Sequence, residues 1–263
     1  MDDEHPPATD PSFWNELRRF TPARIGLGRS GVALPTHEVL AFGWAHARAR
    51  DAVHTPLDHA ALESGLRAAG FDVRHVGSCA PDRATYLRRP DLGRQLEPRH
   101  QEGLQQAASA DLALVIGDGL SSLAVQRHAV PLLVALRERL PSGLSCSPVV
   151  VAQQARVALG DDIGEQLRAR LVVVLIGERP GLSSPDSLGV YLTHAPRRGR
   201  HDAERNCISN VRPGGLPVQL AAHKIAWHVE KALQLGLTGV GLKDESAAAL
   251  PRTRPAADPL PPA

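Results

Sequence analysis

An acid and an arginine stand side by side at Glu178 and Arg179, directly after the apolar run 171–176 and Gly177. A continuous block of Val, Ile and Leu is typical of a strand that is buried on both faces of a sheet. In an open parallel sheet, ligands bind outside the carboxyl ends of the strands, and Glu178 follows such an end. Two interpretations remain for this carboxylate: it contacts a ligand, or it forms a surface ion pair with Arg179.

Two more segments occupy the equivalent position after a predicted buried strand. The sequence GDGLSS at 117–122 follows the apolar block 112–116, and AQQARV at 152–157 follows the block 148–152. The carboxyl ends of parallel strands share one edge of a sheet. These loops, together with GERPGLSS at 177–184, are therefore predicted to border a single ligand crevice.

A glycine-rich segment, GLGRSG from Gly26 to Gly31, matches the G-x-G-x-x-G pattern of dinucleotide-binding proteins, and Asp51 follows it. That fingerprint requires a strand before the glycines and a helix that opens within them. Here the preceding segment 15–24 is charged and broken by a proline, and Pro35 interrupts the segment after the glycines. We therefore expect these glycines to serve turn geometry or subunit contact rather than NAD binding.

The spacing of histidines and cysteines gives no metal site and no catalytic set. The twelve histidines form no H-E-x-x-H motif, and no G-x-S-x-G nucleophile motif occurs. The cysteines Cys79, Cys146 and Cys207 lie far apart, which excludes a zinc ribbon and argues against a disulfide-stabilised domain. Cys207 could be a nucleophile, although a lone cysteine is more often a small buried side chain. No catalytic residue and no metal ligand is assigned.

Composition narrows the class of function further. Aromatic residues make up 3% of the chain, too few for a base-stacking surface, and a net charge of +2 is too small to indicate nucleic acid. No apolar stretch is long enough to cross a bilayer, and the acidic, proline-rich residues 1–12 do not resemble a signal peptide. Scattered cysteines fit a reducing compartment. We expect a soluble cytoplasmic protein without nucleic-acid or membrane partners.

The elements that must position these loops fall into two parts. Residues 13–70 are predicted to form a small helical N-terminal domain. In 71–246, short apolar runs alternate with helical patterns, which indicates an α/β fold with a Rossmann-like, mostly parallel sheet flanked by helices. The proline- and alanine-rich ends, 1–12 and 247–263, are predicted to be disordered. Strands are predicted within 71–77, 111–119, 147–154, 171–181 and 189–194, and helices within 35–54, 56–70, 121–140, 154–171 and 216–236.

Several longer blocks of the chain resemble one known family. They are FTPARIGLGRSGVALPTHEVLAFGWAHARARDAV, LVIGDGLSS, ARVALGDDIGE, VVVLIGERPGLSSPDSLGVYLTH and RNCISNV, which occur in this order between Leu17 and Asp244. Together they are similar to the small (light) subunit of ethanolamine ammonia-lyase. The resemblance is specific because several long blocks agree at once.

The resemblance implies a function that the residues alone do not give. The family belongs to an adenosylcobalamin enzyme that converts ethanolamine to acetaldehyde and ammonia by radical chemistry. Its large subunit is a TIM barrel that holds ethanolamine, and its small subunit, expected to be inactive alone, closes over the cobalamin at the subunit interface. The cobalamin-contacting positions correspond here to Val157, Glu178 and Cys207. A bacterial microcompartment is the implied location in organisms that encode a shell.

One absent motif bears on how the cofactor is held. Many cobalamin modules carry D-x-H-x-x-G, whose histidine replaces the cofactor's own base on cobalt, but DVRHVG at 72–77 has a different spacing. The cofactor is therefore expected to keep its dimethylbenzimidazole ligand. The competing hypothesis is a self-contained α/β enzyme or nucleotide-binding protein that uses the same crevice.

Overall fold

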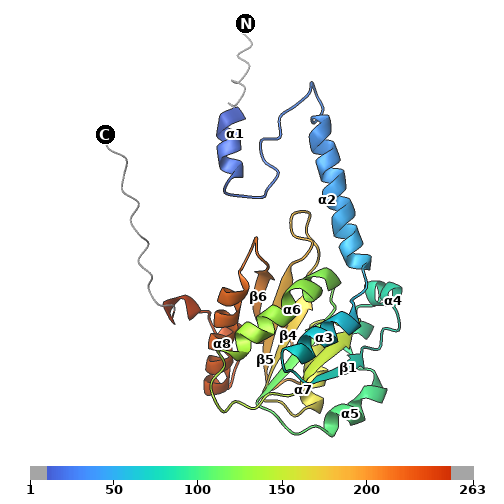
Figure 1. Ribbon diagram of the computed structural model, residues 1–263, viewed down its shortest axis with the longest axis vertical. Helices are drawn as coiled ribbons and strands as arrows, with labels where there is room; N and C mark the ends of the chain where they lie inside the picture. The colour runs from blue at the N-terminus through green and yellow to red at the C-terminus, as the bar shows by residue number, and fades with distance from the viewer. Residues whose placement is uncertain (1–10, 250–263) are drawn as a thin grey trace.

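The computed structural model describes residues 11–249, and it has a six-stranded sheet with helices on both faces and a helical arm before it (Figure 1). The α/β class is confirmed. Most of the predicted disordered ends, 1–12 and 247–263, lies outside the described residues. The helices are α1 (Pro11–Arg18), α2 (Thr36–His54), α3 (His59–Ala68), α4 (Arg83–Arg88), α5 (Gln101–Gln105), α6 (Ser122–Arg137), α7 (Leu159–Gln166) and α8 (Val218–Leu235), and the strands are β1 (Val73–Gly77), β2 (Leu112–Gly117), β3 (Val149–Gln153), β4 (Leu171–Gly177), β5 (Leu188–His194) and β6 (Asn206–Val211).

The strands lie in the order β1-β3-β2-β4-β5-β6. Strands β1 to β4 are mutually parallel, whereas β5 is antiparallel to β4 and β6 is antiparallel to β5. The loop 178–187 contains no helix that could carry the chain back across the sheet, so β5 returns beside β4 in the opposite direction. The predicted parallel arrangement thus holds for β1 to β4, although their order differs from the 3-2-1-4 order of the Rossmann fold. All five predicted strands are present, and β6 is an additional one.

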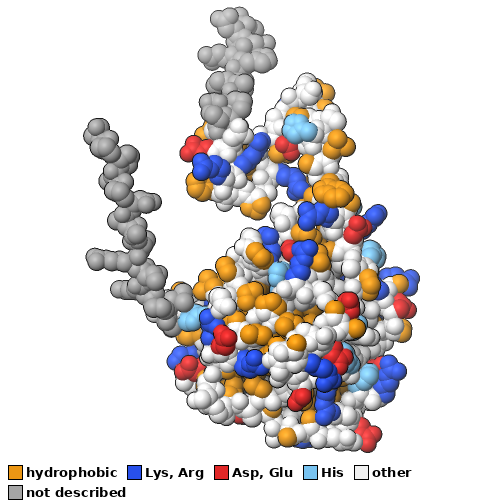
Figure 2. Space-filling view, viewed as in Figure 1, with side chains coloured by type: hydrophobic (Ala, Val, Ile, Leu, Met, Phe, Trp, Pro, Cys, Tyr) orange, Lys and Arg blue, Asp and Glu red, His pale blue; other side chains and the backbone are white. Residues whose placement is uncertain are grey.

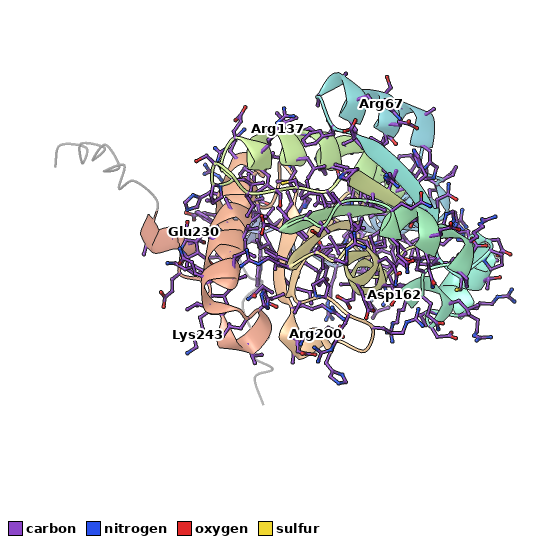
Figure 3. All side chains as sticks on the ribbon, turned by 90° about the horizontal axis from the view of Figure 1, so that it is seen from below. Arg67, Arg137, Asp162, Arg200, Glu230 and Lys243 are labelled. Atoms are coloured by element: carbon purple, nitrogen blue, oxygen red, sulfur yellow. The ribbon has the colours of Figure 1, made fainter. Side chains whose placement is uncertain are left out.

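Successive residues of each buried strand pack alternately into two separate hydrophobic cores, one on each face of the sheet. On β4, Val173 and Leu175 pack with α3, α6 and α8, whereas Val172 and Val174 pack with α5 and α7. We call the second side of the sheet the α7 face. Figure 3 shows the layers edge-on, with Asp162 of α7 on one side of the sheet and Arg137 of α6 on the other.

The α7 face is covered unevenly. Helix α7 packs on β2 and β4, and α8 packs on β5 and β6 from the opposite face. Between them, the α7 face of β5 and β6 is left open, so Tyr191 is only half-buried while Cys207 and Ser209 are exposed. We call Glu178, Tyr191, Cys207 and Ser209 the open patch.

The arm that precedes the sheet is rich in exposed apolar side chains. Eight of the eleven large hydrophobic residues that are exposed in the described chain lie within 13–44, and Figure 2 shows some of them over α2. Only Ala45 and Ala52 of α2 are buried. Helix α2 therefore packs little against the rest of the chain. The eight are Phe13, Phe20, Val32, Leu34, Val39, Leu40, Phe42 and Trp44.

The glycine motif of the arm lacks the context of a dinucleotide site. No strand precedes it in the described residues, and α2 begins only at Thr36. Gly26, Gly28 and Gly31 have φ values of 57°, 76° and 62°, the left-handed region that glycine adopts without strain. A Cβ on Gly26 would also lie 2.3 Å from the Trp14 ring. These φ values fit the turn geometry that the sequence predicts, while a subunit contact by these glycines stays a prediction.

Candidate functional site

The three loops predicted to border a crevice do meet at the carboxyl edge of the sheet. Buried Asp118, directly after β2, accepts hydrogen bonds of 2.9 Å from the backbone N–H groups of Gly119, Gln154 and Ala155. The N–H of Leu120 donates to the carbonyl of Gly177 over 2.9 Å. These bonds fasten the loop after β2 to the loops after β3 and β4.

Glu178 directs its carboxylate onto the α7 face and across β5 to β6. Its Oε2 accepts from the hydroxyl of Ser187 and, over 3.2 Å, from the backbone N–H of Asn210. Its Oε1 accepts from the hydroxyl of Ser209 over 2.5 Å. Among residues 11–249 the partners of the Glu178 carboxylate are Ser187, Ser209 and Asn210, and no ion pair joins it to Arg179, which is exposed. The ion-pair interpretation of this carboxylate is therefore wrong.

A glycine makes room for this arrangement. Gly189 of β5 pairs with Ile176 of β4, and a Cβ there would lie 2.9 Å from Oε1 of Glu178. That contact is closer than side-chain atoms normally allow. The missing side chain at position 189 thus lets the Glu178 carboxylate pass over β5 and reach the serine on β6.

Cys207 lies on β6 opposite Tyr191 of β5. Although the residue is exposed as a whole, its thiol lies against the Tyr191 side chain, and burial raises the pKa of the Cys207 thiol. Burial likewise raises the pKa of the Tyr191 hydroxyl. At neutral pH Cys207 is a thiol rather than a thiolate, so it is a small, soft contact surface and not an activated nucleophile.

Val157 lies between the end of β3 and the start of α7. It is half-buried and packs against the same core on which Tyr191 rests. It also lines a cavity of about 690 Å³ between the start of α7 and the loop 198–205. The structure therefore brings Glu178 and Cys207 together around Tyr191 and places Val157 on the same face of the sheet.

Two adjacent acids at the start of α7 hold the far wall of this cavity. Asp161 is buried and accepts from Arg205 over 2.7 Å, and Arg205 also donates to Thr193 over 3.2 Å. Asp162 accepts from Arg198 over 2.6 and 2.9 Å. Burial raises the pKa of Asp161 to about 6, and the charge of Arg205 opposes that rise. These pairs fix the loop 198–205 against α7.

Sequence reasoning missed Tyr191 and the two ion pairs. The alternation along β5, in which Val190 and Leu192 face one core, places Tyr191 on the other face and could have identified it. The pair Asp161 and Asp162 is visible as a doublet in a helical pattern, but nothing local identifies its arginine partners. In the described residues no group of three or more His, Cys, Asp or Glu side chains could hold a metal ion. No helix of that part is long and apolar enough to span a bilayer.

Comparison with known proteins gives one consistent result. The family model "Ethanolamine ammonia-lyase light chain (EutC)" matches residues 11–243. The ethanolamine ammonia-lyase small subunit of Azotobacter vinelandii is 56% identical over 255 residues, which cover 95% of this chain and 94% of that protein. That of Pseudomonas aeruginosa is 54% identical over 253 residues, covering 94% and 93%. That of Ralstonia nicotianae is 53% identical over 248 residues, covering 92% of each.

These matches include the whole of the sheet and the open patch. They also run through α2 and the glycine turns of the arm, so they do not rest on the α/β fold alone. A self-contained enzyme on the same fold would not share sequence with small subunits over its entire length. The chain belongs to the ethanolamine ammonia-lyase light-chain family.

Proposed function

We propose that this chain, as a subunit of ethanolamine ammonia-lyase, binds adenosylcobalamin on the α7 face at the interface with the large subunit. Val157, Glu178 and Cys207 are the proposed cofactor contacts, and Tyr191 is a fourth. The observation that carries the proposal is the open patch. Three of these four side chains gather on the part of the sheet that none of the helices within residues 11–249 covers. A partner and a large cofactor would complete the layer that is missing there.

The residues of the patch suit the chemistry of a corrinoid. The body of a corrin ring is apolar, and Tyr191 and Val157 offer apolar surface beside it. The ring edge carries amide side chains whose N–H groups donate hydrogen bonds. Glu178 has about four acceptor positions and uses three within the chain, which leaves one on Oε1 for such a donor. Cys207 is small enough to permit close approach.

The cavity beside Val157 offers the complementary group, a free donor. Arg156 lies over the Tyr86 ring at 4.2 Å, and its buried Nε has no partner within the described chain. Such an N–H is costly to leave unpaired. The carbonyl oxygen of a corrin amide would pair with it. Glu178 would then accept a hydrogen bond from the cofactor and Arg156 would donate one to it, and together the two bonds would orient it.

The role of this chain is to bind and orient rather than to react. When bound, adenosylcobalamin supplies an adenosyl radical by cobalt–carbon homolysis, and ethanolamine is held by the TIM barrel of the large subunit. The open patch would exclude water from the covered side of the cofactor. The chain carries no D-x-H-x-x-G histidine, so the cofactor is proposed to keep its dimethylbenzimidazole ligand. The location proposed is cytoplasmic, within a microcompartment where a shell is encoded.

Reconstitution tests this function. The chain is co-expressed with the large subunit, and ethanolamine turnover and equilibrium binding of adenosylcobalamin are measured for the complex and for each subunit. We expect turnover only when both subunits and the cofactor are present, and tighter cofactor binding by the complex than by the large subunit alone. Turnover by this chain alone, or equal cofactor affinity with and without it, would contradict the proposal.

A further inference from the structure

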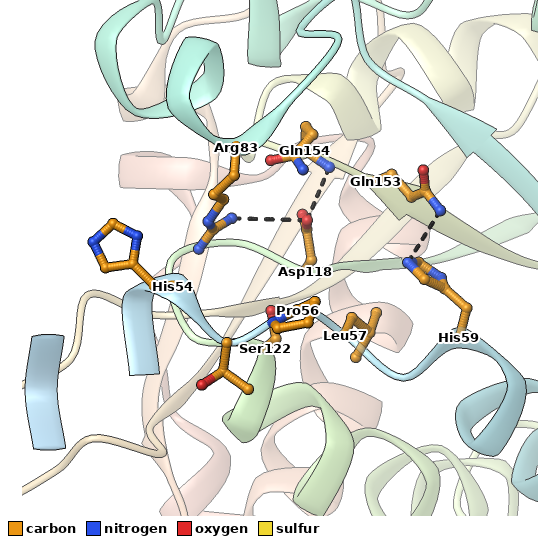
Figure 4. A pocket seen from close by; sticks show the side chains of 10 residues that line it. His54, Pro56, Leu57, His59, Arg83, Asp118, Ser122, Gln153 and Gln154 are labelled. Atoms are coloured by element: carbon orange, nitrogen blue, oxygen red, sulfur yellow. Dashed lines mark hydrogen bonds and ion pairs between the residues drawn. The ribbon is translucent and has the colours of Figure 1, made fainter. Parts of the chain in front are cut away.

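A second cavity lies at the carboxyl ends of β2 and β3, apart from the open patch (Figure 4). Its volume is about 190 Å³, and it shares no lining residue with the cavity beside Val157. The segment 54–57, which joins α2 to α3, forms one side. Figure 4 shows Arg83, Asp118 and Gln154 together on one side of it, with Gln153 and His59 on another.

Three of the residues that line this cavity each carry a buried polar atom without a hydrogen-bond partner in the described chain. These atoms are Nη2 of Arg83, Nδ1 of His59 and Oε1 of Gln154, and they make up half of the six such atoms in the described chain. Buried polar atoms in folded proteins are nearly always hydrogen-bonded. Three unpaired polar atoms in the side chains around one cavity favour a polar occupant over an apolar one.

The donors and acceptors among these atoms can be assigned. The amide nitrogen of Gln153 lies 3.1 Å from Nε2 of His59, and an amide nitrogen only donates. Nε2 therefore accepts, and the neutral ring carries its proton on Nδ1. Burial lowers the pKa of His59, which favours this neutral form. The side chains that line the cavity thus include two unpaired donors, from Arg83 and His59, and one unpaired acceptor, Oε1 of Gln154.

The charges on the walls cancel. Arg83 donates to the carbonyls of Val53 and Gly119, and its Nη1 lies 3.8 Å from Oδ2 of Asp118. Burial raises the pKa of Asp118, but both of its oxygens face only N–H donors, which an ionised carboxylate satisfies best. One positive and one negative charge favour a neutral ligand.

The backbone at Gln154 is held in a conformation that aims its side chain here. Its φ of 52° lies in the left-handed region, which is unfavourable for a residue with a long side chain. Two bonds fix it: its N–H donates to Asp118, and its carbonyl accepts from the Ser78 hydroxyl over 2.8 Å. Strain of this kind gathers at ligand sites.

We propose that this cavity binds a primary carboxamide. The carbonyl oxygen accepts from Arg83 and from His59, and the amide N–H donates to Gln154. A carboxylate of the same size would place its charge beside Asp118 and face the Gln154 oxygen without a hydrogen to donate. An ammonium group would place its positive charge beside that of Arg83. A neutral amide meets neither obstacle.

Probes of equal size test the ligand class. The ¹⁵N-labelled full-length chain is titrated with propionamide and propionate, and the side-chain N–H signals of Arg83 and Gln154 are followed by NMR. We expect saturable shifts with propionamide, with a dissociation constant of about 1–10 mM for so small a ligand, and binding of propionate weaker by about tenfold or more. Propionate binding as tight as that of propionamide, or no saturation by either, would overturn the proposal and leave an anion site or a water-filled cavity.

Variants locate the binding. Gln154→Asn keeps a residue that tolerates the left-handed region but withdraws the carboxamide by one methylene, and Arg83→Lys removes the forked donor. Each is expected to weaken propionamide binding by at least about fivefold. Arg88→Ala, on the exposed side of the same helix α4, is the matched control and should bind normally. Thermal unfolding midpoints confirm that each variant folds, and unchanged binding by folded Gln154→Asn would contradict the assignment.

The amide has two possible sources, and a competition distinguishes them. Adenosylcobalamin is added to the assembled complex in the presence of propionamide. Displacement of propionamide identifies an amide side chain of the corrinoid as the occupant. Simultaneous binding identifies a free carboxamide. Because propionamide binding is measured on this chain alone, the cavity assignment stands or falls independently of the proposed cofactor contacts.

Discussion

Glu178→Gln separates direct contact with the cofactor from a purely structural role of this carboxylate. In the native chain Glu178 accepts from Ser187 and Asn210 on one oxygen and from Ser209 on the other. Glutamine has the same size but offers one acceptor oxygen and an NH₂ donor. With its oxygen toward the fixed backbone N–H of Asn210, it turns its NH₂ toward Ser209, whose hydroxyl can rotate to accept.

This geometry predicts one loss of unfolding free energy and a separate loss of cofactor affinity. Within the chain the variant keeps its hydrogen bonds but loses their charge assistance, which is expected to cost about 1–2 kcal/mol of unfolding free energy. For a chain of this size the thermal midpoint then falls by about 2–8 °C. A cofactor N–H directed at Oε1 would instead meet the new NH₂. That bond is lost outright, so binding weakens by about ten- to a hundredfold.

The assay is a calorimetric titration of adenosylcobalamin into the assembled complex, with thermal unfolding measured in parallel. Ser187→Ala removes an internal partner of Glu178 on the oxygen not assigned to the cofactor. It should share the loss of stability but not the loss of affinity. Glu138→Gln, an exposed acid at the end of α6, should change neither. Equal losses of affinity in Glu178→Gln and Ser187→Ala would show that Glu178 acts only by holding β6. An unchanged affinity in Glu178→Gln would remove it from the site.

Val157→Ala removes two methyl groups that the bound cofactor would cover, and it should weaken cofactor binding by about 5- to 30-fold in the same titration. A greater loss of affinity than that of Glu178→Gln would contradict this expectation. Arg205→Met leaves Asp161 buried without its partner and should lower the unfolding free energy by about 3–5 kcal/mol in urea titrations. A loss below about 1 kcal/mol would show that the pair does not hold the loop. Burial lowers the pKa of His128, so the unfolded chain takes up the proton first and stability falls as pH drops from about 6.5 through the folded value. His128→Gln should flatten that slope between about pH 6.5 and 5, and equal slopes in both proteins would exclude His128 as its source.

The clearest strand predictions come from sequences that carry the signal of complete burial. Every residue of β2 and β4 is buried, and each appears as an unbroken apolar run. Strand β6 was missed because its sequence, NCISNV, buries only Ile208 and Val211. Its α7 face is open, so half of its residues are free to be polar. The strand that borders the proposed cofactor surface is for that reason the hardest one to predict from the sequence.

Glu178 was predictable as a candidate because strand ends place ligand residues, a rule that needs no tertiary information. Its hydrogen-bond partners could not be predicted from the sequence. Ser209 and Asn210 reach it only because β6 pairs with β5, and the sequence offered the adjacent Arg179 as a more obvious partner. Gly189 shows the same limit: its lack of a side chain matters only once β5 lies beside β4. The sequence locates the candidate, but the strand pairing determines its contacts.

The strand order also determines when each strand can pair during synthesis on the ribosome. Among the described strands β1 has β3 as its only neighbour, and Val73 pairs with Val149. At roughly 5–20 residues per second, synthesis reaches that partner on the order of 4–15 s later. Strands β5 and β6 instead each pair with the strand that precedes them in the sequence, β5 with β4 and β6 with β5. The half of the sheet that bears the open patch therefore assembles from contacts that are local in sequence, which form fast. The edge strand β1 can pair only after the more distant β3 has been synthesised.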